Sequence, residues 1–288
     1  MLWTRLVEAV ERAKALDPVV ATATASIHKV LPRGRVKDAL HGTWLGHQLH
    51  PVLVAGPIGF WAGATVLDLT AGAEGRRAAQ RLVGAGLLAA VPTAAAGAAD
   101  WSELGSAKKP LRVGLVHAAV NDVVLVLYAA SWLARRRGEH GRARALALAG
   151  AAGLGVGGYL GGHLAYAQAV GVNRNHAERR VPRDWTDAGA ADLVEGQPRA
   201  VEVAGQSVAV VRLDGRLHAV GAVCSHWGGP LQDGPVVDVA GKPCLECPWH
   251  GSRFRLEDGS VARGPATVPQ LAYDVRTTGD RLEVRVRP

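Results

Sequence analysis

Between residues 51 and 170 the sequence has few charged or polar side chains and is dominated by Ala, Gly, Leu and Val. A water-soluble bundle of Ala-rich helices would show polar stripes at the helical period. This region shows almost none, which argues against a soluble bundle. Four stretches are long enough to span a bilayer, which needs about 20 apolar residues. They lie at about residues 51–71, 82–99, 113–134 and 145–167.

The ends of these stretches and their glycines also fit a membrane domain. Pairs or runs of Lys and Arg flank them, at residues 76–77, 108–109 and 135–137. In the last stretch Gly153, Gly157 and Gly161 recur every four residues. This spacing lets membrane helices approach closely, whereas in water so much glycine would weaken a helix. The sequence therefore predicts an all-α four-helix transmembrane bundle over residues 47–170.

The residues outside the spans bear on orientation. Residues 1–46 form a predicted amphipathic segment that suits the membrane interface. Four spans place both termini on one side, and the flanking Lys and Arg lean slightly toward that side being cytoplasmic. The N-terminus shows neither the apolar core of a signal peptide nor a twin-arginine signal. We therefore expect a multi-pass protein of the inner (plasma) membrane with both termini cytoplasmic. Membrane lipid is an expected partner and nucleic acid is not, because the basic residues gather at span ends.

Cysteine is scarce, and two of the three cysteines stand in blocks that pair a thiol with an imidazole. The blocks are Cys224-Ser225-His226 and Cys247-Pro248-Trp249-His250, with 20 residues between His226 and Cys247. Two Cys and two His are the ligand set of a Rieske [2Fe–2S] centre, in which two Cys hold one iron and two His hold the other. A structural Cys2His2 zinc site is the alternative. Zinc modules usually group like ligands, however, whereas each block here offers one ligand to each iron.

The residues after the blocks carry a family resemblance. With Gly228-Gly229-Pro230-Leu231 and Gly251-Ser252-Arg253-Phe254, the two blocks resemble the cluster-binding loops of Rieske domains. The resemblance implies an all-β Rieske domain over residues 186–288 that carries single electrons, with Cys224, His226, Cys247 and His250 as cluster ligands. Rieske subunits of respiratory complexes have a second Cys in each loop, joined as a disulfide. Those positions are Gly229 and Trp249 here, so the domain resembles the ferredoxin or oxygenase type.

Other residues near the blocks have predicted roles. Trp249 and Ser252 are expected beside the cluster, where the Ser252 hydroxyl could donate to a cluster sulfur and raise the potential. Cys244 precedes the second block by three positions and is interpreted as a small structural residue. With two cysteines on iron, no disulfide pair remains, which fits a reducing compartment. Short Val-rich runs separated by Asp214-Gly215 and similar turns predict antiparallel strands. Residues 171–185 are the predicted linker between the two domains.

Several ionisable residues lie within or at the ends of the predicted spans, where such side chains are costly and mark function by default. They are His47, His50, His117, His163 and Asp100. Up-and-down topology would gather all five at one end of the bundle, the end where both termini lie. Haem b with His117 and His163 as the first pair to test, another metal or quinone site, and a purely structural hydrogen-bonding role are three open hypotheses.

A second resemblance covers about residues 40–172. The matching residues are Gly46-His47-Gln48-Leu49-His50-Pro51, Gly56-Pro57-Ile58-Gly59, Asp100-Trp101, the His117 segment and Gly161-Gly162-His163. They resemble an uncharacterised family of bacterial four-helix membrane domains, some of which are fused to Rieske domains. We expect a membrane-anchored electron-transfer protein that serves a soluble redox partner or a site in the membrane domain. The alternatives are a component of a quinone- or haem-linked oxidoreductase or of an oxygenase electron-donor system, and a redox sensor or scaffold with an inert anchor.

Overall fold

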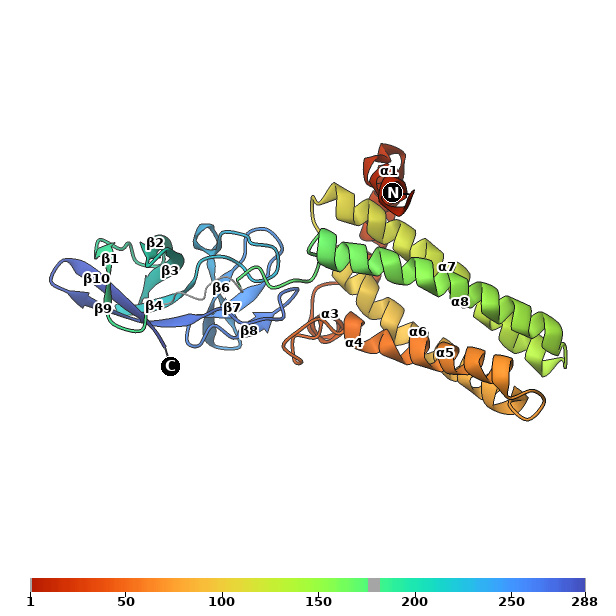
Figure 1. The fold of residues 1–288 in the computed structure, drawn as a ribbon. Coiled ribbons are helices and arrows are strands. Elements are labelled where there is room, and N and C mark those ends of the chain that lie inside the picture. The colour runs from red at the N-terminus through yellow and green to blue at the C-terminus, as the bar shows by residue number, and fades with distance from the viewer. Residues whose placement is uncertain (1, 176–181, 288) are drawn as a thin grey trace. The chain divides into compact units, whose positions relative to one another are not determined.

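The computed structural model describes residues 2–175 and 182–287 and divides into two compact units. One unit comprises Met1–Pro32 and Leu49–Val170, and the other comprises Arg33–Gln48 and Gly171–Pro288. Figure 1 shows that the first is helical and the second is built mainly of strands. The second unit therefore includes a segment that precedes the first span in the chain. The predicted linker at residues 171–185 lies partly outside the described residues.

The helical unit matches the predicted fold class. Its elements are α1 (Leu2–Arg12), a 3-10 turn (Lys14–Leu16), α2 (Asp17–Val30), α4 (His50–Leu53), α5 (Ala55–Thr70), α6 (Arg76–Ser102), α7 (Lys108–Arg136), α8 (His140–Gly162) and a π-helical turn (His163–Ala167). Four segments of the described chain are long and apolar enough to cross a membrane. They are His50–Thr70, Arg76–Ser102, Lys108–Arg136 and His140–Ala167.

A stacked aromatic pair forms the centre of the helical core. Trp61 of α5 and Tyr128 of α7 have ring centroids 4.2 Å apart and planes inclined by only 6°. The Trp61 indole donates to the carbonyl of Val83 in α6 at 3.2 Å. A Cβ at Gly86 would lie 2.3 Å from the indole nitrogen, so glycine is required for α6 to approach this ring. Small and aromatic residues thus fix the spacing of α5, α6 and α7.

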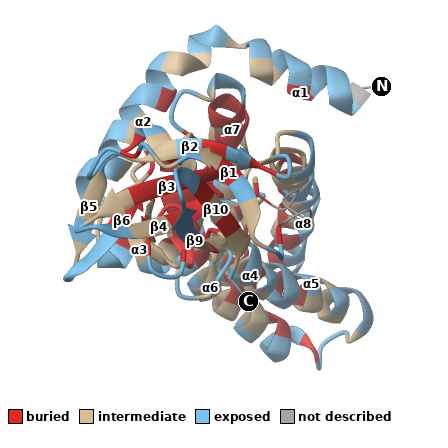
Figure 2. Cartoon of the chain, turned by 90° about the vertical axis from the view of Figure 1, so that its left-hand side faces the viewer, coloured by how far each residue is buried: buried red, intermediate tan, exposed pale blue. Residues whose placement is uncertain are grey.

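The outward faces of the long helices are also apolar. Leu88, Val91 and Val126 are 77%, 66% and 67% exposed. Only 17–28% of the residues in the most apolar stretch of each span are buried within the chain. Figure 2 shows the contrast with the other unit, where buried residues form the centre of β3 and the second half of β4. Because large exposed apolar patches are rare on soluble proteins, these faces fit a lipid environment.

The second unit contains α3 (Arg35–His41) and two antiparallel sheets. Among the described residues one sheet has six strands in the order β1-β10-β9-β4-β3-β2 and the other has four in the order β5-β6-β7-β8. The strands are β1 (Thr186–Ala190), β2 (Arg199–Val203), β3 (Gln206–Leu213), β4 (Arg216–Gly221), β5 (Val236–Val239), β6 (Lys242–Glu246), β7 (Arg253–Arg255), β8 (Val261–Arg263), β9 (Ala272–Thr278) and β10 (Arg281–Val286). The predicted Asp214-Gly215 turn joins β3 to β4, with both residues at positive φ.

The second unit has two apolar clusters. One contains Tyr273, Leu282 and Val284 from β9 and β10 together with valines of β2 and β3. The other joins the two sheets and contains Leu245, Phe254, Cys224 and Cys247. The two predicted sulfur ligands are therefore part of a packed core. This burial fixes the loops that carry them.

Candidate metal centre

Two loops of the same construction carry the four predicted cluster ligands. The first follows β4 and begins at Cys224, and the second joins β6 to β7 and begins at Cys247. In each loop the Cys N–H donates at 2.8 Å to the carbonyl five residues further on. The glycine four residues after each Cys, Gly228 or Gly251, donates back to the Cys carbonyl at 2.8 or 2.9 Å. Both glycines have positive φ, which glycine adopts without steric cost. Each loop thereby folds back on the backbone of its own Cys.

The loops bring thiol to thiol and imidazole to imidazole. Cys224 and Cys247 are 1% and 2% exposed. The hydrogen bond from the Cys224 thiol lowers the pKa of Cys247 to about 6, and the same contact raises the pKa of Cys224. The rings of His226 and His250 lie 5.0 Å apart, centroid to centroid, at an interplanar angle of 89°. The two sulfurs therefore lie close to each other, and so do the two imidazoles.

This pairing fits a two-iron cluster better than one zinc ion. A Rieske centre takes two Cys on one iron and two His on the other, so no iron needs more than two protein ligands. A structural zinc ion needs four ligands around one point. The donor set of Cys224, Cys247, His226 and His250 is therefore suited to a [2Fe–2S] cluster.

A third segment, residues 264–268, supports both loops. The Ser225 hydroxyl donates to the carbonyl of Val268 at 2.6 Å, and the Ala266 N–H donates to the Ser252 hydroxyl oxygen at 3.0 Å. Because the Ser252 oxygen accepts this bond, its own proton remains available for another acceptor, as the predicted bond to a cluster sulfur requires. Sequence reasoning did not identify this segment, although its Gly264-Pro265 pair is a turn signal.

The positions that are cysteine in respiratory Rieske subunits have a packing role here. A Cβ at Gly229 would lie 2.8 Å from Cys247 Sγ and 3.1 Å from the Trp249 ring. Trp249 covers the loop on one side and remains 53% exposed. Cys244 is fully buried in β6, and this burial raises the pKa of its thiol. These surroundings are consistent with the structural role predicted for Cys244.

Residues far away in the sequence also contact the segment at residues 264–268. The Asp38 carboxylate, on α3, accepts from the Gly264 N–H at 3.0 Å and pairs with Arg263 at 3.3 Å. A Cβ at Gly251 in the second loop would lie 2.6 Å from the Arg33 guanidinium. Residues 33–48 thus pack against the loop region of their own unit. No local pattern predicts this pairing, because the partners lie more than 200 residues apart.

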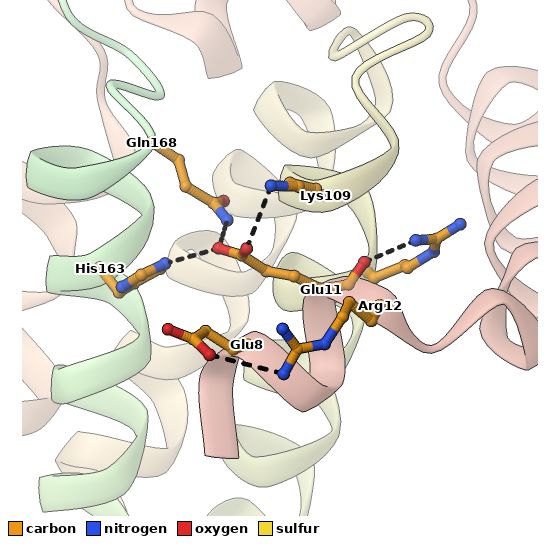
Figure 3. Close-up of polar contacts among 7 residues, drawn as sticks. Glu8, Glu11, Arg12, Lys109, His163 and Gln168 are labelled. Atoms are coloured by element: carbon orange, nitrogen blue, oxygen red, sulfur yellow. Dashed lines mark hydrogen bonds and ion pairs between the residues drawn. The ribbon is translucent and has the colours of Figure 1, made fainter. Parts of the chain in front are cut away.

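The structure separates the predicted membrane histidines. It brings His50 and His117 together, with ring centroids 6.5 Å apart. His163 instead lies at the π-helical turn, where its Nε2 is 3.1 Å from Glu11 Oε1. Figure 3 shows the side chains of His163, Gln168 and Lys109 converging on the Glu11 carboxylate. Sequence reasoning missed Glu11 as the partner of His163.

The other two predicted residues of this group lie elsewhere. His47 is exposed and belongs to the second unit, where its Nδ1 lies 3.0 Å from the carbonyl of Gln48. Asp100, near the end of α6, is 9% exposed. Of the candidate residues, the described contacts therefore single out His50 and His117 as a histidine pair.

Comparison with known proteins bears on both units. Residues 184–278 match the model of the Rieske [2Fe-2S] domain. The anthranilate 1,2-dioxygenase ferredoxin subunit of Burkholderia cepacia is 34% identical over 104 residues, which cover 36% of this chain and 93% of that protein. The chain belongs to the Rieske [2Fe–2S] family. Its role is therefore Rieske electron transfer with a [2Fe–2S] cluster. Residues 46–174 match a different family, described as a predicted membrane protein (DUF2231).

Further relatives are similar to the Rieske domain alone. Apoptosis-inducing factor 3 of Mus musculus is 31% identical over 41% of this chain, and the chain spans only 21% of that protein's length. The solved ferredoxin of carbazole 1,9a-dioxygenase from Nocardioides aromaticivorans is 32% identical, with a TM-score of 0.33. The match covers 35% of this chain and 99% of that one. The family matches over residues 184–278 and 46–174 confirm both predicted resemblances.

Proposed function

We propose that this protein is a membrane-anchored Rieske electron carrier that delivers single electrons to a redox partner protein. Cys224 and Cys247 would hold one iron of the cluster, and His226 and His250 the other. The cluster supplies one-electron chemistry when bound. The observation that supports the assignment is the matched pair of loops, which brings the two buried sulfurs together and the two imidazoles together.

Membrane anchoring is supported by the helical unit. Four segments have the length and composition of spans, and their outward faces expose large apolar side chains. Pairs or runs of Lys and Arg flank these segments at residues 76–77, 108–109 and 135–137, where anionic headgroups attract them. We place the Rieske domain and both termini on the cytoplasmic side of the inner membrane, as the flanking charges favour. Protease protection of sealed vesicles of known sidedness tests this placement.

The partner we propose is a soluble oxygenase or a related redox protein. Several relatives of the Rieske domain are ferredoxin components of dioxygenase systems, including those for anthranilate and naphthalene. Trp249 lies between two cluster ligands in sequence and is 53% exposed. Exposed aromatic side chains are enriched at protein interfaces. Trp249 is therefore the side chain we expect a partner to contact first.

The test is the electron paramagnetic resonance (EPR) signal of the detergent-purified protein after reduction by dithionite. The intact chain should give the signal of a reduced Rieske cluster, and His226→Ala should abolish it. Cys244→Ser is the matched control, because this cysteine is buried in the same domain but is not a proposed ligand. Survival of the signal in His226→Ala would overturn the ligand assignment. Recovery of the protein in the soluble fraction without detergent would overturn the anchoring.

A further inference from the structure

His50 and His117 form a close pair that the Rieske function does not use. His50 is the first residue of α4, and His117 lies in the first half of α7. Their ring centroids are 6.5 Å apart, and the ring planes are inclined by 82°. Ionisable side chains inside spans are rare because of their cost, and they mark ligand or proton sites by default. The surroundings of the two rings indicate which role this pair has.

Backbone carbonyls fix the protonation of both rings. His50 Nδ1 lies 2.9 Å from the carbonyl of Thr93, and His117 Nδ1 lies 3.0 Å from the carbonyl of Gly157. A carbonyl can only accept, so each Nδ1 carries a proton, and in the neutral ring each Nε2 keeps its lone pair. Metal-binding histidines are usually oriented in this way, with the second ring nitrogen donating to a carbonyl or carboxylate. His163 differs, because its Nε2 faces the Glu11 carboxylate.

Glycines on the neighbouring helices allow the helix backbone to pack closely against each ring. A Cβ at Gly97 of α6 would lie 2.9 Å from the His50 ring, and a Cβ at Gly161 of α8 would lie 3.3 Å from the His117 ring. The Asn121 amide donates to the carbonyl of His117 at 2.8 Å and lies a longer 3.3 Å from its Nε2. The stronger bond of Asn121 is therefore made to the backbone. The longer contact with Nε2 is the one that a metal would replace.

The separation of the rings fits ligands on opposite sides of one metal. Metal–imidazole bonds of about 2.0–2.1 Å place two opposing ring centres roughly 6 Å apart. Both rings then contain the ligand–metal axis, so any angle between their planes is allowed, including 82°. In residues 2–175 and 182–287 no third His, Cys, Asp or Glu joins them at a single-ion site. A metal held here must therefore bring its remaining ligands with it.

We propose that His50 and His117 are the two axial ligands of a non-covalently bound haem in the helical unit. A porphyrin supplies four nitrogen ligands to its iron, so two imidazoles complete the coordination. The sequence hypothesis paired His117 with His163, and the structure replaces His163 with His50. This site goes beyond the proposed Rieske function and does not depend on it. It gives the helical unit a one-electron centre of its own.

The test is optical. Protein expressed with ample haem supply and purified in detergent should show a Soret band, a sharp α-band after dithionite, and one haem per chain by the pyridine haemochrome assay. His50→Gly and His117→Gly should each lose the α-band, and added imidazole should restore it, which a merely structural role would not allow. His163→Gly and His47→Gly are matched controls that should keep the spectrum.

Three outcomes would overturn the proposal. They are wild-type protein without porphyrin, loss of the bands in His163→Gly but not in His50→Gly, and a bound metal ion without porphyrin. The Rieske EPR signal is recorded on the same samples. It reports the β domain separately, so failure of the haem proposal is distinguishable from failure of the cluster assignment.

Discussion

The two candidate metal sites of this chain are built in opposite ways. In the Rieske domain each Cys–His pair comes from one short loop, closed by hydrogen bonds between residues four and five positions apart. In the helical unit His50 and His117 come from different spans, and each ring is held by a carbonyl on a further helix. The first site depends on local backbone geometry, whereas the second depends on helix packing. Substitutions that affect each kind of support separately test this difference.

The largest effect is expected at Gly229 of the first cluster loop. In Gly229→Ala the new Cβ would lie 2.8 Å from Cys247 Sγ, so the two loops must separate. Most of the Rieske EPR signal should be lost, while the haem bands are unchanged. Gly205→Ala is the control, because Gly205 lies in a turn of the same domain, has positive φ, and has no atom within 4 Å of its Cβ position. That variant carries about 1–2 kcal/mol of backbone strain and should keep its cluster. Equal losses in both variants would show that the collision with Cys247 is not what empties the site.

The second effect is expected at Gly97 of the helical site. A Cβ at this position would lie 2.9 Å from the His50 ring, so Gly97→Ala should displace that ring and lower the haem content severalfold. The matched control is Gly155→Ala, where the new methyl group meets no atom within 4 Å. Both variants replace a glycine inside a long helix, so they share the same change in helix propensity. Unchanged haem content in Gly97→Ala would contradict the proposed position of His50.

The difference between the sites also explains what the sequence could predict. The cluster ligands occupy two short blocks with fixed spacing, and apolar composition identifies the four spans, so the fold class and both family resemblances were predicted correctly. The support segment at residues 264–268 and its contact with Asp38 were missed. Hydrogen bonds between residues so far apart leave no periodic or local pattern.

The membrane histidines show the same limit within one unit. Alternating span direction correctly predicts which ends of the spans are near each other, but it does not fix the rotation of each helix about its axis. That rotation decides that His117 faces His50, and the π-helical turn at His163–Ala167 directs His163 to Glu11. Of the glycines that permit the close contacts, Gly161 was recognised only as part of a spacing motif, and Gly97 was not recognised. The partner of each imidazole therefore required the structure.

A third prediction concerns a buried ion pair near the C-terminal end of α7, whereas His117 lies in the first half of this helix. Arg135 donates two hydrogen bonds to the Asp68 carboxylate, and the two side chains are 4% and 9% exposed. Asp68→Asn leaves the arginine charge buried without a counter-charge, which costs about 3 kcal/mol. The melting temperature of the helical unit in detergent should fall clearly, with the Rieske EPR signal unchanged. Arg142→Gln breaks an exposed pair with Glu139 and should change nothing measurable, so a similar loss there would contradict this explanation.

The smallest effect is expected at Glu11, which attaches α1 to the helical unit. Burial alone would raise the pKa of Glu11, but hydrogen bonds from Gln168 and His163 and the charge of Lys109 outweigh it and hold the pKa below its ordinary value of 4.5. A carboxylate with a depressed folded-state pKa contributes stability above the unfolded value and loses it as the pH falls through the folded value. Hydrogen-exchange protection of α1 should therefore decrease as the pH falls below about 4.5.

Glu11→Gln removes the charge on which this attachment depends. It should lower the protection of α1 by about 1 kcal/mol at neutral pH and abolish the acid-dependent loss. Glu8→Gln is the matched control on the same helix, because Glu8 forms only an exposed pair with Arg12 (Figure 3). If Glu8→Gln removes the acid dependence and Glu11→Gln keeps it, the attachment is not made through His163, Gln168 and Lys109. The haem bands should stay intact in Glu11→Gln. Loss of α1 protection with intact haem bands would show that His163 holds α1 and acts separately from the His50–His117 pair.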